Sequence, residues 1–561
     1  MSNQDEAKKY FFEGIKLYSK KDYSGAINEF EKSLRISPDR PSILLNLAKT
    51  YFKINNFKNA EKNLEILISL KGHDQEKKEA LNLLLEVYLK LDDVNGINKL
   101  RKISYLENYF DNYNKLKIQM FYPRFFDTFK EIEITRNDYE KNIDSLLSNE
   151  KLPKLSLDED LIYTPNFPLS YDGHDNLKIN NKLTILYKKI YQKLNQENNF
   201  KIEKNDKIKI GFISEFFTNH TILKLFQGII YKLDKSKFEV FVFFSDKTLP
   251  GNRYDEIKRN CIIHNYQNVF LPKDFEEKVR SIKNVNLDIL FYTDIHMSKD
   301  LFFLTLLKLA KFQITSWGHP ETTGNEKIDF FLSSELLETN NYQKRYSEKV
   351  LLSKYLPMYF YKPKLNKSLS EDLISKNNIY SCPQNLMKMH PTFDTAIKKI
   401  LDIDKKAKIY FIKDTNEIMT KKFFQRLKKQ ISTNMDRVIF TDKYDVDGFI
   451  NHCGRSSVLL DPFIFGAGNS FHESMYYGTP TVTMPTEYLK SRIVLGAYKQ
   501  MKIDNPPVAK DIDEYVDMCV QLANSNIEIK ENYRESANKY LFENENVIRD
   551  LEEIFENIVN E

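Results

Sequence analysis

The chain has 561 residues, 41% of them hydrophobic and 29% charged, which is the balance of a globular protein with several hydrophobic cores. Its 84 basic and 79 acidic residues give a formal net charge of +5, and this small excess, without a basic block, argues against a nucleic-acid partner. No apolar run approaches the ~20 residues of a membrane span, so we expect no span. The N-terminus lacks an apolar signal core, which predicts a cytoplasmic protein. The four cysteines form no CxxC pair, so we expect free thiols.

The N-terminal segment repeats itself. The copies that begin at Ala7 and Pro41 lie 34 positions apart, which is the length of a tetratricopeptide (TPR) repeat. Small residues stand where paired helices must approach closely: Gly14, Ala26, Ala48 and Ala60. A third, poorer copy follows, so we predict TPR-like helices over residues 1–105. The repeats could form a peptide-binding groove or a structural cap, since each repeat buries its apolar face only against neighbours.

Residues 106–200 are predicted to form a helical connector. Its helical periodicity is broken by NEKLPKLSLDEDLIYTPNFPLS, where proline and acidic residues predominate. The following segment, NNKLTILYKKIYQKLNQ, has the pattern of one amphipathic helix. No residues in this stretch suggest chemistry.

From Lys207 onward, short buried strands alternate with helical segments. One set runs from KIKIGFIS to KVLLS and a second from NIYSCP to TPTVTMP. This alternation predicts α/β architecture with parallel sheets, in two Rossmann-like lobes over 201–365 and 366–561, the second ending in closing helices. Ligands of such sheets bind beyond the carboxyl ends of strands, and polar clusters such as SEFFTNH, TDIHMS, GHPETTG and FGAGNS follow the predicted strands.

The segment DPFIFGAGNSFHESMYYGTPTVTMP, from Asp461 to Pro485, is the strongest ligand candidate. It has no GxGxxG spacing, and the chain has no GxxxxGK[ST] motif, which argues against a dinucleotide and excludes a P-loop. Asn469 and Ser470 could cap a helix there and donate to phosphate, and Glu473 could accept from a diol such as ribose. Together these residues fit a nucleoside diphosphate.

Several motifs in one order carry a family resemblance. They are GFISEFFTNH, DILFYTDIHM, TSWGHPETTGNEKIDFFLSSELLE, YSEKVLLS, CPQNLMKMHP, RVIFTD, LLDPFIFGAGNSFHESMYYGTPTVTMP and KSRIVLGAYKQM. From about Lys207 to Ile503 the chain resembles the O-linked N-acetylglucosamine transferase (SPINDLY-type) family of TPR-containing glycosyltransferases, including bacterial cytoplasmic relatives that glucosylate adhesins. The resemblance implies a GT-B fold of two Rossmann-like lobes preceded by an α-helical TPR domain. It also implies an inverting, metal-independent transferase that uses a UDP-sugar.

The resemblance also implies which residues bind the nucleotide sugar. Lys388 matches the lysine that stabilises the departing diphosphate. Animal members have a glutamine three positions before it, where this chain has Asn385, with Gln384 one position earlier, so either could reach the phosphate. Gly468 replaces a histidine that donates to phosphate in those members. The implied nucleotide-sugar residues are Gln384, Asn385, Lys388, Lys443, Phe449, Gly468, Asn469, Ser470 and Glu473.

The predicted N-terminal lobe supplies the other side of the implied site. His220 matches the family's cleft histidine and could act as a base or donate a hydrogen bond. His296 is expected to line the core or the cleft. The residues expected on the sugar or acceptor side are His319, Thr322, Thr323 and Gly324.

No metal or other cofactor is expected. The DxD pairs at Asp402, Asp445 and Asp511 do not follow a buried strand with a partner carboxylate. The hypothesis is therefore transfer of GlcNAc or a hexose from a UDP-sugar to a protein Ser or Thr, or to Asn, with the acceptor presented by the TPR region. The alternatives are a TPR interaction protein with a degenerate transferase fold, and a transferase acting on a glycan.

Overall fold

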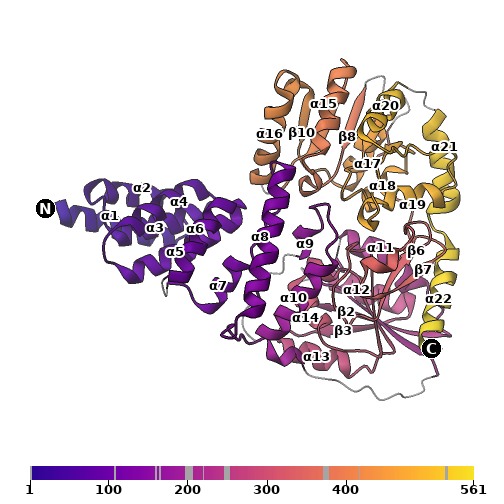
Figure 1. The fold of residues 1–561 in the computed structure, drawn as a ribbon, viewed down its shortest axis with the longest axis horizontal. Coiled ribbons are helices and arrows are strands. Elements are labelled where there is room, and N and C mark those ends of the chain that lie inside the picture. The colour runs from indigo at the N-terminus through magenta and orange to yellow at the C-terminus, as the bar shows by residue number, and fades with distance from the viewer. Residues whose placement is uncertain are drawn as a thin grey trace. The chain divides into compact units, whose positions relative to one another are not determined.

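The computed structural model describes residues 3–106, 109–157, 161–162, 166–195, 206–218, 220–245, 253–369, 378–415, 417–524 and 528–560. The chain forms two compact units, Met1–Arg124 and Phe125–Glu561 (Figure 1). The break therefore falls within the predicted connector and not at residue 105. The predicted boundary at residues 200 and 201 lies outside the described residues.

The first unit is built of helix pairs. Its helices are α1 (Asn3–Ser19), α2 (Tyr23–Ile36), α3 (Pro41–Lys53), α4 (Phe57–Ser69), α5 (Asp74–Leu91), α6 (Val94–Leu106) and α7 (Asn112–Gln119). The side chains of Asp22 and Asn56 cap α2 and α4, at equivalent places in successive repeats. A Cβ at Gly14 would lie 2.6 Å from the Phe30 ring, so only glycine lets α1 and α2 approach this closely. The predicted TPR architecture is confirmed.

The second unit begins with helices that sequence assigned to the connector. They are α8 (Phe129–Ser148), α9 (Asn166–Leu169) and α10 (Leu177–Ile190). Lys182 of α10 lies 2.8 Å from Glu140 and 2.6 Å from Asp144, which ties α10 to α8. These helices belong to the second unit, whereas α7 belongs to the first.

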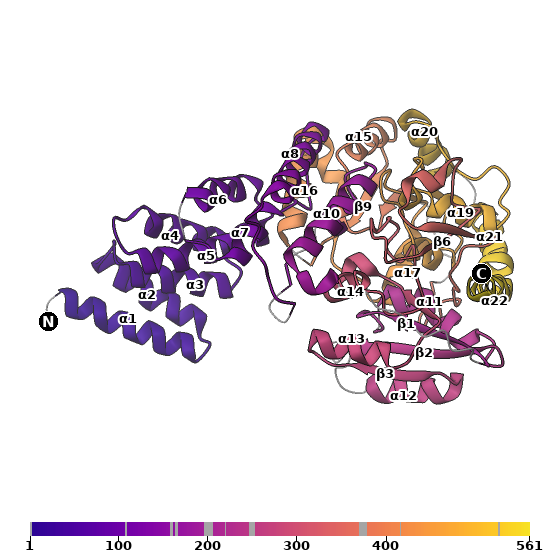
Figure 2. The ribbon, with the colours of Figure 1, turned by 60° about the horizontal axis from the view of Figure 1, so that its bottom comes forward.

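The first sheet of this unit has seven parallel strands in the order β3-β2-β1-β4-β5-β6-β7. They are β1 (Ile208–Ile213), β2 (Phe238–Ser245), β3 (Gln267–Leu271), β4 (Ile289–Tyr292), β5 (Phe312–Ser316), β6 (Phe330–Ser334) and β7 (Lys349–Ser353). Ile210 pairs with Val240 on one side and Ile289 on the other. The helices that connect its first strands are α11 (Thr221–Lys232), α12 (Arg253–His264), α13 (Phe275–Lys283) and α14 (Lys299–Thr305), seen near β1, β2 and β3 in Figure 2. The strand order reverses between β1 and β4, which makes their carboxyl ends the topological switch point.

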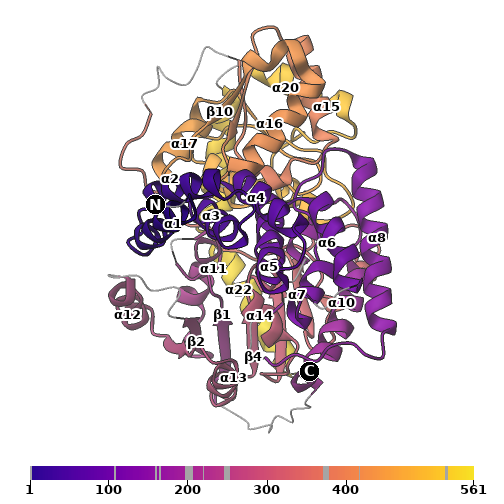
Figure 3. The ribbon, with the colours of Figure 1, turned by 90° about the vertical axis from the view of Figure 1, so that its left-hand side faces the viewer.

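The second sheet has five parallel strands in the order β10-β9-β8-β11-β12. They are β8 (Ile379–Cys382), β9 (Lys408–Ile412), β10 (Val438–Thr441), β11 (Val458–Leu460) and β12 (Thr481–Val482). Its helices are α15 (Phe393–Ile403), α16 (Glu417–Ile431), α17 (Val446–Arg455), α18 (Asn469–Ser474), α19 (Ile493–Gln500) and α20 (Ile512–Ala523), several of which appear in the upper part of Figure 3. The strand order reverses between β8 and β11. Two parallel sheets in series confirm the predicted α/β fold of two Rossmann-like lobes.

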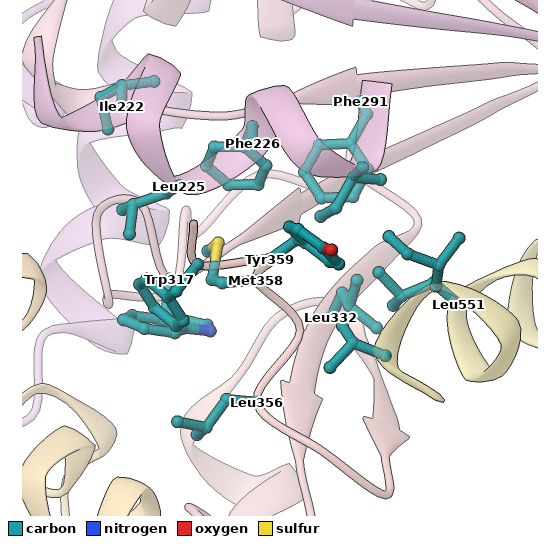
Figure 4. Close-up of a cluster of buried hydrophobic side chains, with 14 of the residues drawn as sticks. Ile222, Leu225, Phe226, Phe291, Trp317, Leu332, Leu356, Met358, Tyr359 and Leu551 are labelled. Carbon is teal, nitrogen blue, oxygen red and sulfur yellow. The ribbon is translucent and has the colours of Figure 1, made fainter. Parts of the chain in front are cut away.

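The last helices return to the first sheet. After α21 (Glu528–Ser536), α22 (Glu545–Asn560) buries Leu551 and Phe555 in the core cluster that also holds Leu332 and Phe291 (Figure 4). Asp550 of α22 accepts a hydrogen bond from the hydroxyl of Ser353 at 2.6 Å. By packing, α22 therefore belongs to the first lobe, although sequence placed it with the second. None of the described helices is long and apolar enough to cross a membrane.

Candidate active site

Lys388 lies at the switch point of the second sheet. It ends a short 3-10 helix (Leu386–Lys388) directly after β8, where the loop that follows β11 also arrives. Its Nζ donates to Gln384 Oε1 at 2.9 Å and to the Gly466 carbonyl at 2.7 Å, and lies 4.9 Å from the centre of the Phe465 ring. The Lys388 amine therefore bridges the loop that follows β8 and the loop that follows β11.

The structure distinguishes the two amides before Lys388. Gln384 is buried and donates from Nε2 to Ser470 Oγ at 2.6 Å, so it contacts both Lys388 and the β11 loop. Asn385 is exposed and accepts from the Met387 N–H at 2.9 Å, which caps the 3-10 helix. Gln384 is thus the amide that lies against both Lys388 and Ser470.

Asp461 is a charged group that sequence reasoning missed. It is 1% exposed and accepts hydrogen bonds from Ala467 N and Thr483 Oγ1, both at 2.6 Å, which folds the glycine-bearing loop back on itself. Burial raises the pKa of its carboxyl, and the Lys388 amine opposes that rise. Burial likewise lowers the pKa of Lys388, opposed first by Asp461. The signal in the sequence was an aspartate at a strand end directly before the glycine loop.

The β11 loop leads into α18. Gly468 precedes the helix with φ −110° and supplies no side-chain cap. Asn469 and Ser470 are the first two helical residues, so the predicted helix cap by these side chains is wrong; Ser470 bonds Gln384 instead. His472 stacks on Phe360, with ring centres 3.4 Å apart, and burial lowers its pKa to about 3. His472 therefore packs against the lobe, as predicted.

A cavity of about 250 Å³ opens beside Gln384 at the carboxyl ends of β8, β9 and β10. It brings together four of the predicted nucleotide-binding residues: Gln384, Asn385, Lys443 and Phe449. Lys443 is exposed and donates to Thr415 Oγ1 at 2.6 Å, and Phe449 is half-buried. An aromatic face, a cation and amides around one cavity are groups suited to a planar heterocycle.

Glu473, on the last turn of α18, lies against the first lobe. Its Oε1 is 2.6 Å from Nζ of Lys224 in α11. The pair joins the predicted ribose residue to the helix that begins at His220. Sequence reasoning did not find Lys224, because 249 positions separate it from Glu473.

His220 caps α11. Its Nδ1 accepts from the Ile222 N–H at 3.2 Å, and its ring lies 4.8 Å from that of Phe216. Burial lowers the pKa of His220, and the Lys224 charge lowers it further, so the neutral imidazole is favoured. A neutral imidazole that accepts at Nδ1 carries its proton on Nε2, so in this arrangement His220 presents a donor and not a base.

His319 lies deeper, between the connector and both lobes. Its Nε2 is 3.1 Å from Ser170 Oγ, and its ring packs 5.1 Å from Phe167 and 4.9 Å from His296. Burial lowers the pKa of both histidines, which favours the neutral imidazole in each. Phe465 links this cluster to Lys388, with its ring 6.4 Å from His319.

Thr322, Thr323 and Gly324 do not join the groups around Lys388. The Thr322 hydroxyl donates to the buried carboxylate of Glu348 at 2.8 Å, and the Thr323 N–H donates to the same carboxylate at 2.7 Å. Gly324 has φ +64° and packs on the Asn180 backbone, which excludes any Cβ. These contacts favour a structural role over the predicted sugar or acceptor side.

The aspartates of the three DxD pairs have contacts of their own. Asp445 and Asp511 accept from backbone N–H groups as the caps of α17 and α20. Asp404 accepts from the Tyr380 hydroxyl at 2.8 Å, and Asp402 pairs with Lys398. The described residues contain no group of three or more His, Cys, Asp or Glu side chains placed to hold a metal.

Comparisons with known proteins agree with this geometry. The family model for glycosyl transferase family 41 matches residues 143–415, and the TPR repeat model matches residues 14–55. The family match ends before the β11 loop, so the placement of Asp461 to Glu473 rests on the structure.

Two curated relatives differ in the sugar for which they are named. The probable UDP-N-acetylglucosamine–peptide N-acetylglucosaminyltransferase SEC of Arabidopsis thaliana is 22% identical over 335 residues, which cover 56% of this chain and 33% of that protein. The UDP-glucose:protein N-beta-glucosyltransferase of Actinobacillus pleuropneumoniae serotype 5b is 24% identical over 276 residues, covering 48% of this chain and 43% of that protein. The chain thus spans less than half the length of these relatives.

A solved structure matches along the whole chain. A mutant of the Thermobaculum terrenum O-GlcNAc transferase superposes with a TM-score of 0.64 at 14% identity, covering 100% of this chain and 98% of that one. This likeness shows the fold. Together, these matches show that the chain is similar to glycosyl transferase family 41 over residues 143–415 and to the TPR repeat over residues 14–55, and that it has the fold of an O-GlcNAc transferase.

Proposed function

We propose that the chain transfers a sugar from a UDP-sugar to a side chain of a protein, with inversion and without a metal ion. The observation that carries the proposal is the Lys388 amine held between Gln384 and the β11 loop, beside the cavity lined by Lys443 and Phe449. The cavity is suited to uracil, and the neighbouring cation to the diphosphate.

Each group then has a defined task. Inverting transfer breaks the bond between the anomeric carbon and the diphosphate oxygen while the acceptor heteroatom attacks in line from the opposite face. The acceptor loses its proton in the same step, to an oxygen of the departing diphosphate or to solvent. Negative charge builds on the diphosphate, where the Lys388 cation and the Ser470 hydroxyl lie ready to stabilise it. The Nε2 proton of His220 is available as a hydrogen-bond donor on the first-lobe side.

The two relatives support different sugars. One is named for N-acetylglucosamine and the other for glucose, and both are named for a peptide or protein acceptor. Labelled UDP-GlcNAc and UDP-glucose, each incubated with the protein and a lysate of its own host, test donor and acceptor together. Label on a protein Ser, Thr or Asn supports the proposal. Label on a glycan alone identifies a glycan transferase, and no transfer with either donor favours a binding protein with a degenerate site.

Nucleotide binding is expected to need no divalent ion. The positive charge beside the diphosphate site comes from Lys388, and charge-assisted hydrogen bonds of this kind are the strong ones. Calorimetry should therefore give the same UDP affinity with EDTA and with added Mg²⁺. Loss of binding on chelation would contradict metal-independent binding.

Deleting residues 1–124 is expected to spare UDP binding and abolish transfer to protein. The groups proposed to hold the nucleotide all lie in the second unit, Phe125–Glu561, and the deleted part is a compact unit with its own core. Calorimetry and the lysate assay measure the two effects separately. A truncated protein that melts early would instead support a structural cap, and full transfer to protein would contradict both roles of the repeats.

A further inference from the structure

An ion pair links α11 of the first lobe to Glu473 in α18 of the second, three residues after Ser470, which bonds Gln384 of the proposed nucleotide site. Lys224 Nζ lies 2.6 Å from Glu473 Oε1, with 34% and 15% of the two side chains exposed. Lys224 stands one turn after His220 in α11, and its N–H donates to the His220 carbonyl at 3.4 Å. The first turn of α11, in the first lobe, therefore contacts the Glu473 carboxylate of α18 in the second lobe.

The ion pair uses one of the two Glu473 carboxylate oxygens and leaves Oε2 able to accept a hydrogen bond from a ligand. Among the described residues, Lys224 is the side chain that bonds Glu473, and it takes only Oε1. Phe471 and His472, the residues before Glu473, are buried and hold α18 in place. With the helix fixed and one oxygen held, the direction of Oε2 is set before any ligand arrives.

Stability alone does not explain such a pair. Partly exposed ion pairs contribute about 0–1 kcal/mol to folding, because solvent screens the charges and two long side chains lose their freedom. The loss of freedom is, however, useful at a binding site, since a side chain already held in place has less entropy to lose when the ligand binds. The pair is thus better suited to orienting Glu473 than to stabilising the fold.

We propose that Lys224 is a positioning residue that holds Glu473 through Oε1 so that Oε2 accepts from the ribose hydroxyls, which gives the site its preference for a ribonucleotide. The inference rests on the proposed binding of a uridine nucleotide. It adds a first-lobe residue that determines specificity at a site otherwise built from the second lobe.

The test compares UDP with 2′-deoxy-UDP, whose sugar lacks one of the two hydroxyls. Calorimetry gives both dissociation constants for the wild type, Lys224→Met, Lys224→Arg, Glu473→Gln and the double variant Lys224→Met with Glu473→Gln. Lys232→Met is the matched control, because Lys232 is the last residue of the same helix, at the opposite end from His220, is 31% exposed and pairs with Glu545 at 2.6 Å.

We expect the wild type to favour UDP over 2′-deoxy-UDP by about tenfold, as for the loss of one charge-assisted hydrogen bond. Lys224→Met and Glu473→Gln should both bring the ratio close to one, the double variant should resemble Glu473→Gln, and Lys224→Arg and Lys232→Met should keep the wild-type ratio. A Lys224→Met protein that discriminates like the wild type overturns the inference. A wild type that binds neither nucleotide contradicts the proposed function itself, so the two failures are distinguishable.

Discussion

Replacing Lys388 by alanine is expected to lower the rate of sugar transfer by about 10²–10³-fold, the usual cost of removing one preorganised group that stabilises developing charge. Lys388 is the cation held between the β8 and β11 loops, by Gln384 and the Gly466 carbonyl. The Lys388 charge stabilises the leaving diphosphate most in the transition state, so the substitution should lower kcat most strongly. It should also weaken UDP binding to a smaller extent. Initial rates with a labelled donor and calorimetry with UDP measure the two effects.

The same lysine predicts a pH dependence. Burial lowers the pKa of Lys388, so the cation is present at low and neutral pH and is lost as pH rises, before the ordinary range of a lysine is reached. UDP affinity of the wild type should therefore fall on the alkaline side, and the Lys388→Ala variant should lack that fall. Lys421→Ala is the control, because Lys421 is an exposed lysine that pairs with Glu417 on α16. Unchanged turnover in Lys388→Ala would exclude a role for this amine at the diphosphate.

Some of the proposed site residues follow strands of the second sheet. Lys388 and Ser470 come shortly after β8 and β11, and the carboxyl ends of neighbouring parallel strands must meet at one edge. The family resemblance had singled out Lys388, and the strand order in the structure, with β8 beside β11, brings it next to the β11 loop. The TPR helices could be predicted from the sequence, because small residues such as Gly14 recur at the positions where the two helices of a repeat pack closely against each other.

The residues that sequence reasoning missed depend on contacts between distant segments. Lys224 meets Glu473 only because α11 and α18 face each other across the two lobes. The threonines after β5 looked suited to a ligand, but Glu348, from just before β7, is buried beside them and takes their hydrogen bonds. Hydroxyls near a strand end can serve a ligand or a buried carboxylate, and only the fold distinguishes the two uses.

Asn385 and Gln384 show the limit of reasoning from position. The side chains of adjacent residues at a strand end point in different directions. The family resemblance could not say whether Gln384 or Asn385 takes the place of the animal glutamine, so it could not say which amide faces the site. The backbone turns into the 3-10 helix at Asn385, whose side chain then caps it, and Gln384 is left facing Lys388. A local capping preference thus decided which amide reaches the site.

Replacing Arg426 by alanine is expected to destabilise the second unit by about 3–5 kcal/mol, the cost of removing one member of a buried ion pair. Arg426 of α16 is 2% exposed and donates from Nε and Nη2 to both carboxylate oxygens of Asp394, at 2.7 and 2.8 Å. It also donates to the carbonyls of Phe126 and Met389, each at 2.7 Å. The Arg426 side chain therefore supplies hydrogen bonds to three buried acceptors: the Phe126 carbonyl at the start of the second unit, the Met389 carbonyl next to Lys388, and the Asp394 carboxylate.

The consequence of its loss follows from those partners. Without Arg426, Asp394 stays buried with no neutralising charge, and the pKa of its carboxyl, which burial already raises, should rise further. The guanidinium also lies 4.6 Å from the Phe125 ring centre and 5.2 Å from that of Phe423, so its removal opens a gap between two aromatic rings. Thermal unfolding of the second lobe, which holds Arg426, should show a midpoint lower by about 10 °C, given the usual 2–4 °C per kcal/mol for a domain of the size of this lobe.

A double variant separates the charge from the packing. Arg426→Met with Asp394→Leu removes both charges and keeps apolar bulk, and buried pairs replaced in this way are often neutral in stability. We therefore expect it to recover most of the midpoint lost in Arg426→Ala. Lys429→Ala is the control on the same helix, since Lys429 is exposed and pairs with Asp127 at 3.1 Å, and its midpoint should stay within about 1 °C of the wild type. If Arg426→Ala melts like Lys429→Ala, the buried network around Asp394 does not stabilise this lobe.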